Sequence, residues 1–176
     1  DYPASFMMVA SMNPCPCGYH NHPDKDCSCG PGIVKRYLGK ISGPLMDRID
    51  LHVEVTPVSY EELSEKSRNG ERSEIISERV IKARKIQEKR FEEIPGVHCN
   101  AQMPPRMVRT FCRIDSESTT ILKSAMEKLQ LSARAYDRIL KVARTAADLR
   151  ASENINSEDI SEAINYRTLD RENWSD

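Results

Sequence analysis

Four cysteines in two Cys-x-Cys pairs are the residues whose type and spacing point most directly to chemistry: Cys15, Cys17, Cys27 and Cys29. Four thiolates at this spacing can surround a tetrahedral zinc ion, and four protein ligands leave no open position for a reacting water. The pattern therefore predicts a structural zinc site. His20 and His22 lie in the intervening loop and can replace one thiolate. Unligated thiols or redox pairing are the alternatives.

Asn13 is the second candidate, because it ends the apolar run FMMVASM at residues 6–12. If this run is a buried strand of an open α/β sheet, Asn13 lies at its carboxyl end, where ligands bind in such sheets. A carboxamide both donates to and accepts from water, which suits it to orient the nucleophile beside a γ-phosphate. The alternative interpretation is a turn-forming asparagine before Pro14.

Two arginines at expected helix ends are candidates for binding phosphate. Arg48 ends a short helical stretch, PLMDR, and precedes the alternating pattern IDLHVEV. It can act as an arginine finger on a γ-phosphate or as a solvated charge at a helix C-terminus. Arg134 lies near the start of the helical pattern LSARAYDRILKVARTAADL, where a guanidinium combines with free backbone N–H groups to bind phosphate. The alternative interpretation is that the Arg134 side chain only faces solvent.

The N-terminal part of the chain has the pattern of a mixed α/β structure. Residues 6–12 are almost continuously apolar, as in a buried parallel strand. Residues 49–55 alternate apolar and polar side chains, as in a strand with one buried face. Residues 14–32 are rich in Pro, Gly, Asp and Cys and predict a loop, and residues 33–41 predict a short helix. We therefore expect a few strands plus helices in this part.

Helical patterns occupy the rest of the chain. Residues 72–93 predict a long amphipathic helix, and residues 97–103 have the composition of a linker. Four more helices are expected, at 104–112, 116–129, 133–150 and 157–166, with Asp115, Ser132 and Asn156 as the N-caps of the last three. We thus predict two domains, residues 1–96 with strands and residues 97–176 with helices alone.

Composition places the chain among soluble globular proteins. Hydrophobic residues make up 39% of its 176 residues and charged residues 30%, with a formal net charge of −1. No apolar run approaches the ~20 residues of a membrane span, and the first residues lack the basic region of a signal peptide. Six cysteines without a secretion signal favour metal ligation or free thiols in the cytoplasm. Cys99 and Cys112 are expected to be buried or spare thiols.

No phosphate-binding loop is found in the sequence. Gly39-Lys40-Ile41-Ser42 lacks the GxxxxGK[ST] frame and follows no predicted strand. No apolar run ends in the adjacent acidic residues of a Walker B motif. The sequence starts without Met at the edge of an apolar run, so we interpret its start as an arbitrary cut. The chain alone is therefore expected to be inactive as an ATPase.

Five stretches, taken in order, resemble the magnesium-chelatase-like AAA+ ATPases of the ComM/YifB family: FMMVASMNPCPCGY, DCSCGPG, RYLGKISGPLMDRIDLHVEV, LSARAYDRILKVARTAADL and INSEDISEAINYRTLDR. They span nearly the whole chain. The resemblance implies the C-terminal part of an AAA+ core with a Cys-rich insertion, followed by an all-α helical lid. Both Walker motifs would lie upstream, in the other half of the same protein.

The resemblance also implies roles for the candidate residues. Asn13 matches sensor 1, Arg48 matches the arginine finger that acts on a neighbouring subunit, and Arg134 matches sensor 2 on the lid. The four cysteines match an insertion typical of this family. For the full-length protein the resemblance implies a homo-hexamer that hydrolyses ATP with Mg²⁺, the best-known member type being a DNA branch-migration helicase of natural transformation.

A different class of function stays open. The helix at 72–93 mixes basic residues with glutamates, which is more typical of a solvated face with i,i+4 pairs than of a DNA contact. The zinc site and the helices would then form a non-enzymatic module that binds DNA or protein. Such a module predicts salt-sensitive DNA affinity of the isolated chain.

Overall fold

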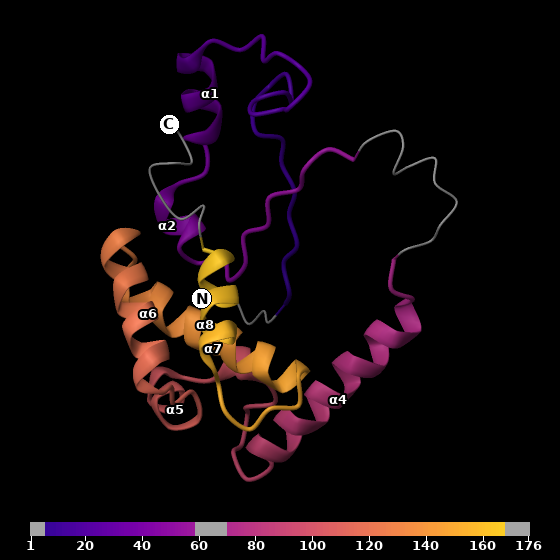
Figure 1. Cartoon of the computed structure of the whole chain (residues 1–176), viewed down its shortest axis with the longest axis vertical. Coiled ribbons are helices and arrows are strands. Elements are labelled where there is room, and N and C mark those ends of the chain that lie inside the picture. The colour runs from indigo at the N-terminus through magenta and orange to yellow at the C-terminus, as the bar shows by residue number, and fades with distance from the viewer. Residues whose placement is uncertain (1–5, 59–69, 168–176) are drawn as a thin grey trace. The chain divides into compact units, whose positions relative to one another are not determined.

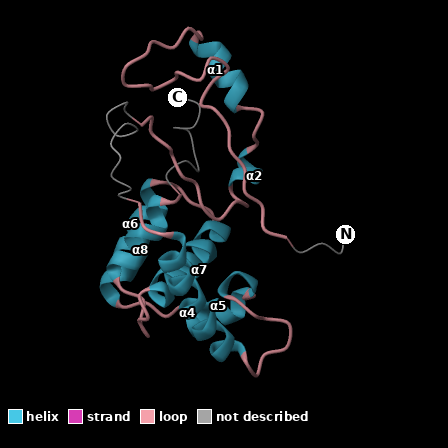
Figure 2. Cartoon of the chain, turned by 90° about the vertical axis from the view of Figure 1, so that its right-hand side faces the viewer, coloured by secondary structure: helices cyan, strands magenta, loops and turns pink. Residues whose placement is uncertain are grey.

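Helices form all the regular secondary structure of the part that the computed structural model describes, residues 6–58 and 70–167 (Figure 1, Figure 2). In chain order they are α1 (Pro31–Leu38), α2 (Gly43–Met46), α4 (Ser73–Phe91), the 3₁₀ turn η1 (Asn100–Gln102), α5 (Pro105–Phe111), α6 (Ser116–Lys128), α7 (Ala133–Leu149) and α8 (Ser157–Asn165). None of these described helices is both long enough and apolar enough to cross a membrane. The chain divides into a Cys-rich unit up to residue 42 and a helical unit from residue 43.

The two predicted strands are not found. Residues 6–12 and 49–55 are both described, and neither forms a β-ladder with another described segment, although the His52 backbone N–H donates to the Tyr166 carbonyl. A strand exists only when its backbone N–H and C=O groups pair with those of a neighbour. Without one, apolar side chains stay open to solvent, as at Met7 (88% exposed) and Val55 (84% exposed). The helical part of the predicted fold is therefore confirmed, and the α/β part is not.

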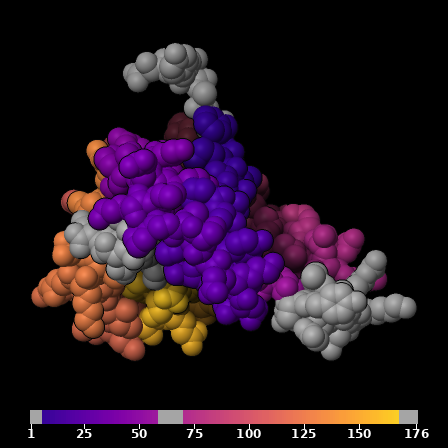
Figure 3. Space-filling model, turned by 90° about the horizontal axis from the view of Figure 1, so that it is seen from above, coloured from indigo at the N-terminus to yellow at the C-terminus, as the bar shows by residue number. Residues whose placement is uncertain are grey.

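A small core joins the cysteine loop to α1 in the Cys-rich unit, whose atoms are drawn in indigo to violet in Figure 3. Cys15 is fully buried and packs with Val34 and Leu38, which lie on one face of α1. The other three cysteines pack against this core. The helix begins before the predicted 33–41 because Pro31 is tolerated in a first helical turn.

α7 is the central helix of the helical unit (Figure 1). It packs against α8, α4, α5 and η1, while α6 packs on α8. Its buried apolar side chains are small or branched: Ala135, Ile139, Leu140, Ala143 and Ala147. Because these residues recur at three- and four-residue spacing, they form one inward stripe on which the neighbouring helices close.

The predicted N-caps of the last three helices are confirmed: Asp115, Ser132 and Asn156. The Ser118 backbone N–H donates to the Asp115 carboxylate at 2.7 Å, and the Ala135 N–H donates to the Ser132 hydroxyl at 3.1 Å. Each cap satisfies a backbone donor that the first helical turn leaves without an intrahelical partner. These caps explain why the starts of α6, α7 and α8 were predictable.

Residues 97–103 belong to the core and not to a linker. Met103 is 2% exposed and Asn100 is 1% exposed, and the segment contains η1. The Asn100 backbone N–H donates to the side-chain carbonyl of Gln87 on α4, at 3.2 Å. The sequence prediction was wrong here because Asn is usually exposed, whereas Asn100 is hydrogen-bonded in the interior, its backbone N–H to Gln87 and its side chain to Asp148.

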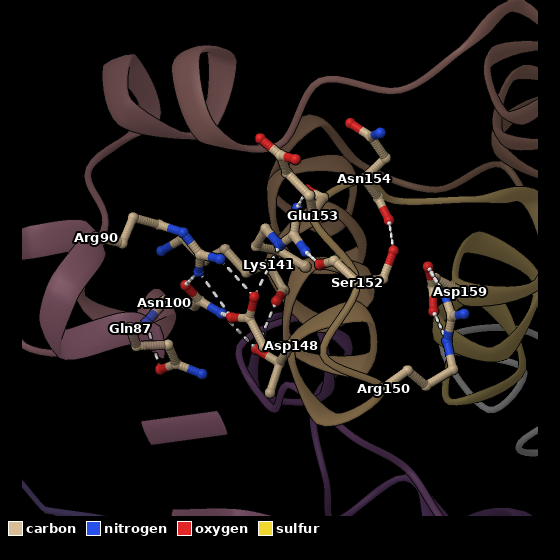
Figure 4. Close-up of polar contacts among 12 residues, drawn as sticks. Gln87, Arg90, Asn100, Lys141, Asp148, Arg150, Ser152, Glu153, Asn154 and Asp159 are labelled. Atoms are coloured by element: carbon tan, nitrogen blue, oxygen red, sulfur yellow. Dashed lines mark hydrogen bonds and ion pairs between the residues drawn. The ribbon is translucent and has the colours of Figure 1, made fainter. Parts of the chain in front are cut away.

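Asp148, near the end of α7, joins α4 and η1 to that helix through a buried polar network (Figure 4). Arg90 of α4 donates to both carboxylate oxygens of Asp148, at 2.7 Å through Nη1. Asn100 Nδ2 donates to Asp148 Oδ2 at 2.8 Å, and Arg144 Nε lies 3.2 Å from Oδ1. The carboxylate is 1% exposed, so two guanidinium groups neutralise it inside the protein.

Candidate functional site

The four thiols of the Cys-rich unit converge on one point. Their sulfur atoms all lie within 4.8 Å of one another, and three of the separations are 3.3, 3.5 and 3.7 Å. Sulfurs placed about 2.3 Å from a tetrahedral zinc ion lie about 3.8 Å apart. The cluster therefore has the donor type, number and spacing of a structural zinc site.

The chain direction at the first Cys-x-Cys pair is set by a tight turn. The Gly18 backbone N–H donates to the Cys15 carbonyl at 3.0 Å, and Gly18 has φ +84°, a conformation that side chains rarely adopt. This turn brings Cys15 and Cys17 to the same side as the second pair. α1 then follows directly and covers Cys15.

The pKa values of the clustered thiols are those of a group that a bound cation would stabilise. A hydrogen bond from the Tyr19 backbone N–H lowers the pKa of Cys17 to about 5. The Cys29 backbone hydrogen bond acts in the same direction on Cys27, but desolvation and the neighbouring Cys17 and Cys15 raise the pKa of Cys27 to about 12. Thiolates packed together repel one another, so the ionisation of one thiol raises the pKa of its neighbours. A divalent cation would remove this repulsion.

The two histidines of the loop do not join the cluster, which consists of the four cysteines. His22 Nδ1 instead accepts the Asp24 backbone N–H at 3.0 Å, and its ring lies edge-on to Tyr19. Of the candidate ligand sets, the structure thus assembles the one with four thiolates.

The two remaining cysteines lie outside the cluster. Cys112 is buried in the core of the helical unit, and burial raises the pKa of its thiol to about 12. Cys99 is half-buried, just before η1. Because a thiol with so high a pKa is not a nucleophile at neutral pH, Cys112 behaves as a buried apolar side chain, as predicted.

Asn13 is exposed in the Cys-rich unit, immediately before the cysteine loop. The strand that would place it at a sheet edge is not found among the described residues. Its side-chain nitrogen lies 3.9 Å from where a Cβ at Gly18 would be. Asn13 belongs to the Cys-rich unit, whereas both candidate arginines belong to the helical unit.

Arg48 lies on a turn that follows α2. Its backbone N–H donates to the Leu45 carbonyl at 3.0 Å, and Nη1 of its side chain donates to the Pro44 carbonyl at 2.8 Å. The residue is exposed. A single contact to an exposed backbone carbonyl is easily exchanged for another acceptor, so the guanidinium is available to an external anion.

Arg134 is the second residue of α7 and is also exposed. It lies two residues after the N-cap Ser132, beside backbone N–H groups that the first turn leaves without helical partners. A phosphate at this position would meet the guanidinium and the positive end of the helix dipole together.

The turn that carries Arg48 is fastened to the start of α7. The Asp47 carboxylate accepts the Ser132 hydroxyl at 2.9 Å, and Asp50 forms an ion pair with Arg138, one turn after Arg134. Both contacts lie within the helical unit. Residues far apart in sequence make them, so sequence analysis missed Asp47 and Asp50; the one local signal was an aspartate on either side of Arg48.

The residues after α8 hold the same turn from another direction. Arg167 is 1% exposed; its guanidinium donates to the Ile49 carbonyl and lies 3.6 Å from the Asp47 carboxylate. The His52 backbone N–H donates to the Tyr166 carbonyl at 2.9 Å. The Arg48 turn is thus anchored both by the start of α7 and by the residues that follow α8.

Two family models match the chain. Residues 1–63 match the model described as magnesium chelatase, subunit ChlI, and residues 70–167 match the model described as magnesium chelatase, subunit ChlI C-terminal. The second match covers the helices α4 to α8, and each of the anchoring contacts described above joins a residue of the first match to a residue of the second.

Curated relatives match nearly the whole chain. The uncharacterized protein YifB of Escherichia coli K12 is 39% identical over 170 residues, which are 97% of this chain and 32% of the relative. Competence protein ComM of Haemophilus influenzae is 38% identical with the same coverage, and an uncharacterized protein of Mycobacterium bovis is 34% identical over 166 residues. The chain spans about a third of the length of these relatives. It therefore belongs to the magnesium-chelatase-like family that includes ComM and YifB.

Proposed function

We propose that this chain is the C-terminal part of an AAA+ ATPase subunit and supplies sensor 1, the arginine finger and sensor 2 to an ATP-driven ring. Family membership supports the class. The observation that carries the proposal is the placement of Arg48 and Arg134. Both are exposed, and both belong to segments that are bonded to each other within one unit.

Arg48 has the properties that an arginine finger requires. The transferred γ-phosphoryl group gains negative charge at its equatorial oxygens, so catalysis consists mainly of positioning and charge stabilisation. A planar guanidinium donates two parallel hydrogen bonds to such oxygens. Because Arg48 is exposed on an anchored turn, it can reach a nucleotide held by a neighbouring subunit while its backbone stays fixed.

The other two residues act at the same kind of centre. Arg134, with the N-terminal N–H groups of α7, would bind phosphate and couple it to lid movement. Asn13 would orient the attacking water through its carboxamide. ATP with Mg²⁺ would supply the phosphoryl group and the neutralising cation in the full-length assembly.

The process driven by ATP is proposed to be remodelling of DNA, as by a branch-migration helicase in a cytoplasmic homo-hexamer. The support is the likeness to a relative named competence protein ComM. We also propose a domain boundary at residues 96 and 97, with the helical lid after it, while the two family-model matches end at residue 63 and begin at residue 70.

ATP hydrolysis by the full-length protein tests the arginine assignment. We expect Arg48→Ala to lower turnover by ~10³–10⁵-fold, the usual cost of losing an arginine finger. Arg36→Ala is the matched control, because Arg36 is an exposed arginine on α1 of the other unit. Turnover by Arg48→Ala within a few-fold of wild type would show that the assignment is wrong.

We also propose that the metal of the four-thiol cluster is zinc and that its role is structural. The support is the thiolate donor set and the sulfur separations of 3.3–3.7 Å. The cysteines would hold the loop closed against α1. Metal analysis of protein purified without added metal should give about one zinc ion per chain. Folded protein without any metal would refute the proposal.

A further inference from the structure

Two aspartates on either side of Arg48 contact two residues on either side of Arg134. In the turn, Asp47 and Asp50 flank Arg48. On α7, Ser132 precedes Arg134 by two residues and Arg138 follows it by one helical turn. Asp47 bonds to Ser132 and Asp50 to Arg138. We call these two contacts the Asp clasp.

We propose that the Asp clasp makes the Arg48 turn and the start of α7 one mechanical body, so that Asp47 and Asp50 are positioning residues for Arg48. The inference rests on the proposed function, in which Arg48 and Arg134 both act at nucleotide sites. Its consequence is that a displacement of α7 sensed through Arg134 moves Arg48 by the same rotation.

The Asp47 contact is built into the helix cap itself. Ser132 donates its hydroxyl proton to Asp47, at 2.9 Å from Oδ1 and 3.0 Å from Oδ2, while its oxygen accepts the Ala135 N–H at 3.1 Å. The carboxylate therefore acts on the α7 N-terminus through the serine, and its negative charge lies at the favourable end of the helix dipole. The turn cannot leave α7 without weakening the cap of α7.

The Asp50 contact adds orientation. A single hydrogen bond at Ser132 would let the turn pivot, whereas the ion pair with Arg138, one turn further along α7, fixes a second point. Buried Arg167 also holds the turn, because its guanidinium donates to the Ile49 carbonyl. The Arg48 backbone is thus held on both sides, and its exposed side chain is left to act.

α7 is suited to carry such a displacement because it is the central helix of the unit. Its other end is joined to α4 through Asp148 and Arg90, and its inward stripe packs on α8 and α5. Close-packed helices move as rigid bodies and deform little. The clasp therefore connects the Arg48 turn to the helix on which α4, α5 and α8 pack.

Amide hydrogen exchange of this 176-residue chain tests the clasp without reference to ATP. The reporters are the amides of Ile49 and His52, which donate to the Met46 and Tyr166 carbonyls. We expect Asp50→Arg and Arg138→Asp, each alone, to speed this exchange by about tenfold or more. The double charge reversal should restore it. Unchanged exchange in both single variants would overturn the clasp.

ATP turnover of the full-length protein tests positioning with the same variants and with Asp47→Ala, which removes both oxygens that accept from Ser132. Each single variant should lower kcat by about 10²-fold, the cost of misplacing a catalytic group by roughly 1 Å, with the KM for ATP changed less than kcat. The Asp50→Arg/Arg138→Asp pair should regain most of kcat. The matched control reverses the exposed pair Glu71–Arg79, which touches neither segment, and it should keep wild-type turnover.

The outcomes separate the two proposals. If Arg48→Ala abolishes turnover but faster exchange at Ile49 leaves kcat unchanged, positioning is overturned and the finger assignment stands. If Arg48→Ala itself is active, both fail. Lower kcat in the single variants together with recovery in the charge-reversed pair supports the inference, because the recovery shows that the ion pair itself, and not either side chain alone, sets kcat.

Discussion

Asp148→Ala should be among the most destabilising single substitutions in the helical unit. The change removes a carboxylate that is 1% exposed and that accepts from Arg90 and Asn100 and pairs with Arg144. The guanidinium groups left behind are shielded from water, because the side chain of Arg144 is 4% exposed and that of Arg90 is 14% exposed.

The magnitude follows from the charges left behind. Removing one partner of a buried ion pair costs ~3–5 kcal/mol, most of it the desolvation of the charge that remains. A buried hydrogen bond lost at Asn100 acts in the same direction. Since small proteins are stable by only about 5–15 kcal/mol, this is a large fraction of the total.

Urea unfolding monitored by circular dichroism measures the change in free energy. The control is Glu71→Ala, because Glu71 also accepts two hydrogen bonds from one arginine of α4, at 2.8 and 2.9 Å from Arg79, but in an exposed pair. That variant should lose at most about 1 kcal/mol. Equal losses in the two variants would refute the argument that burial sets the cost at Asp148.

Two further predictions concern the N-cap of α6 and the metal cluster. A hydrogen bond from the backbone N–H of Ser118 lowers the pKa of Asp115. The ionised Asp115 therefore stabilises the fold above the pKa that an aspartate has in the unfolded chain, about 3.9. This stabilisation is lost as pH falls through the lower pKa of the folded state. Asp115→Asn should therefore flatten the acid limb of the unfolding free energy against pH, and an unaltered limb would contradict the cap assignment. Cys17→Ser should reduce bound zinc well below one ion per chain, whereas Cys99→Ser, outside the cluster, should not; equal zinc contents would count against the four-thiol site.

Local signals in the sequence were sufficient for the helices and for the four residues of the thiol cluster. The caps Asp115, Ser132 and Asn156 act within one helical turn, so residue type and spacing alone located them. The cysteine pairs likewise lie within one loop, which left only the choice among the candidate ligands to the structure.

Features that depend on distant partners were missed. The apolar run at 6–12 has the composition of a strand, but a strand also needs a neighbour to pair with, and none is found among the described residues. Asn100 was assigned to a linker because its partners, Gln87 and Asp148, come from two different helices. The clasp of Asp47 with Ser132 joins segments that no periodicity connects.

A subunit-mixing experiment with the full-length protein tests the central claim that Arg48 serves a neighbour's nucleotide. One population carries Arg48→Ala, and the other carries an inactivated phosphate-binding loop with Arg48 intact. Each alone should hydrolyse almost no ATP. Mixed rings should regain turnover, because some interfaces then pair an intact nucleotide site with an intact Arg48. Mixtures that stay as inactive as the two separate populations would contradict the account.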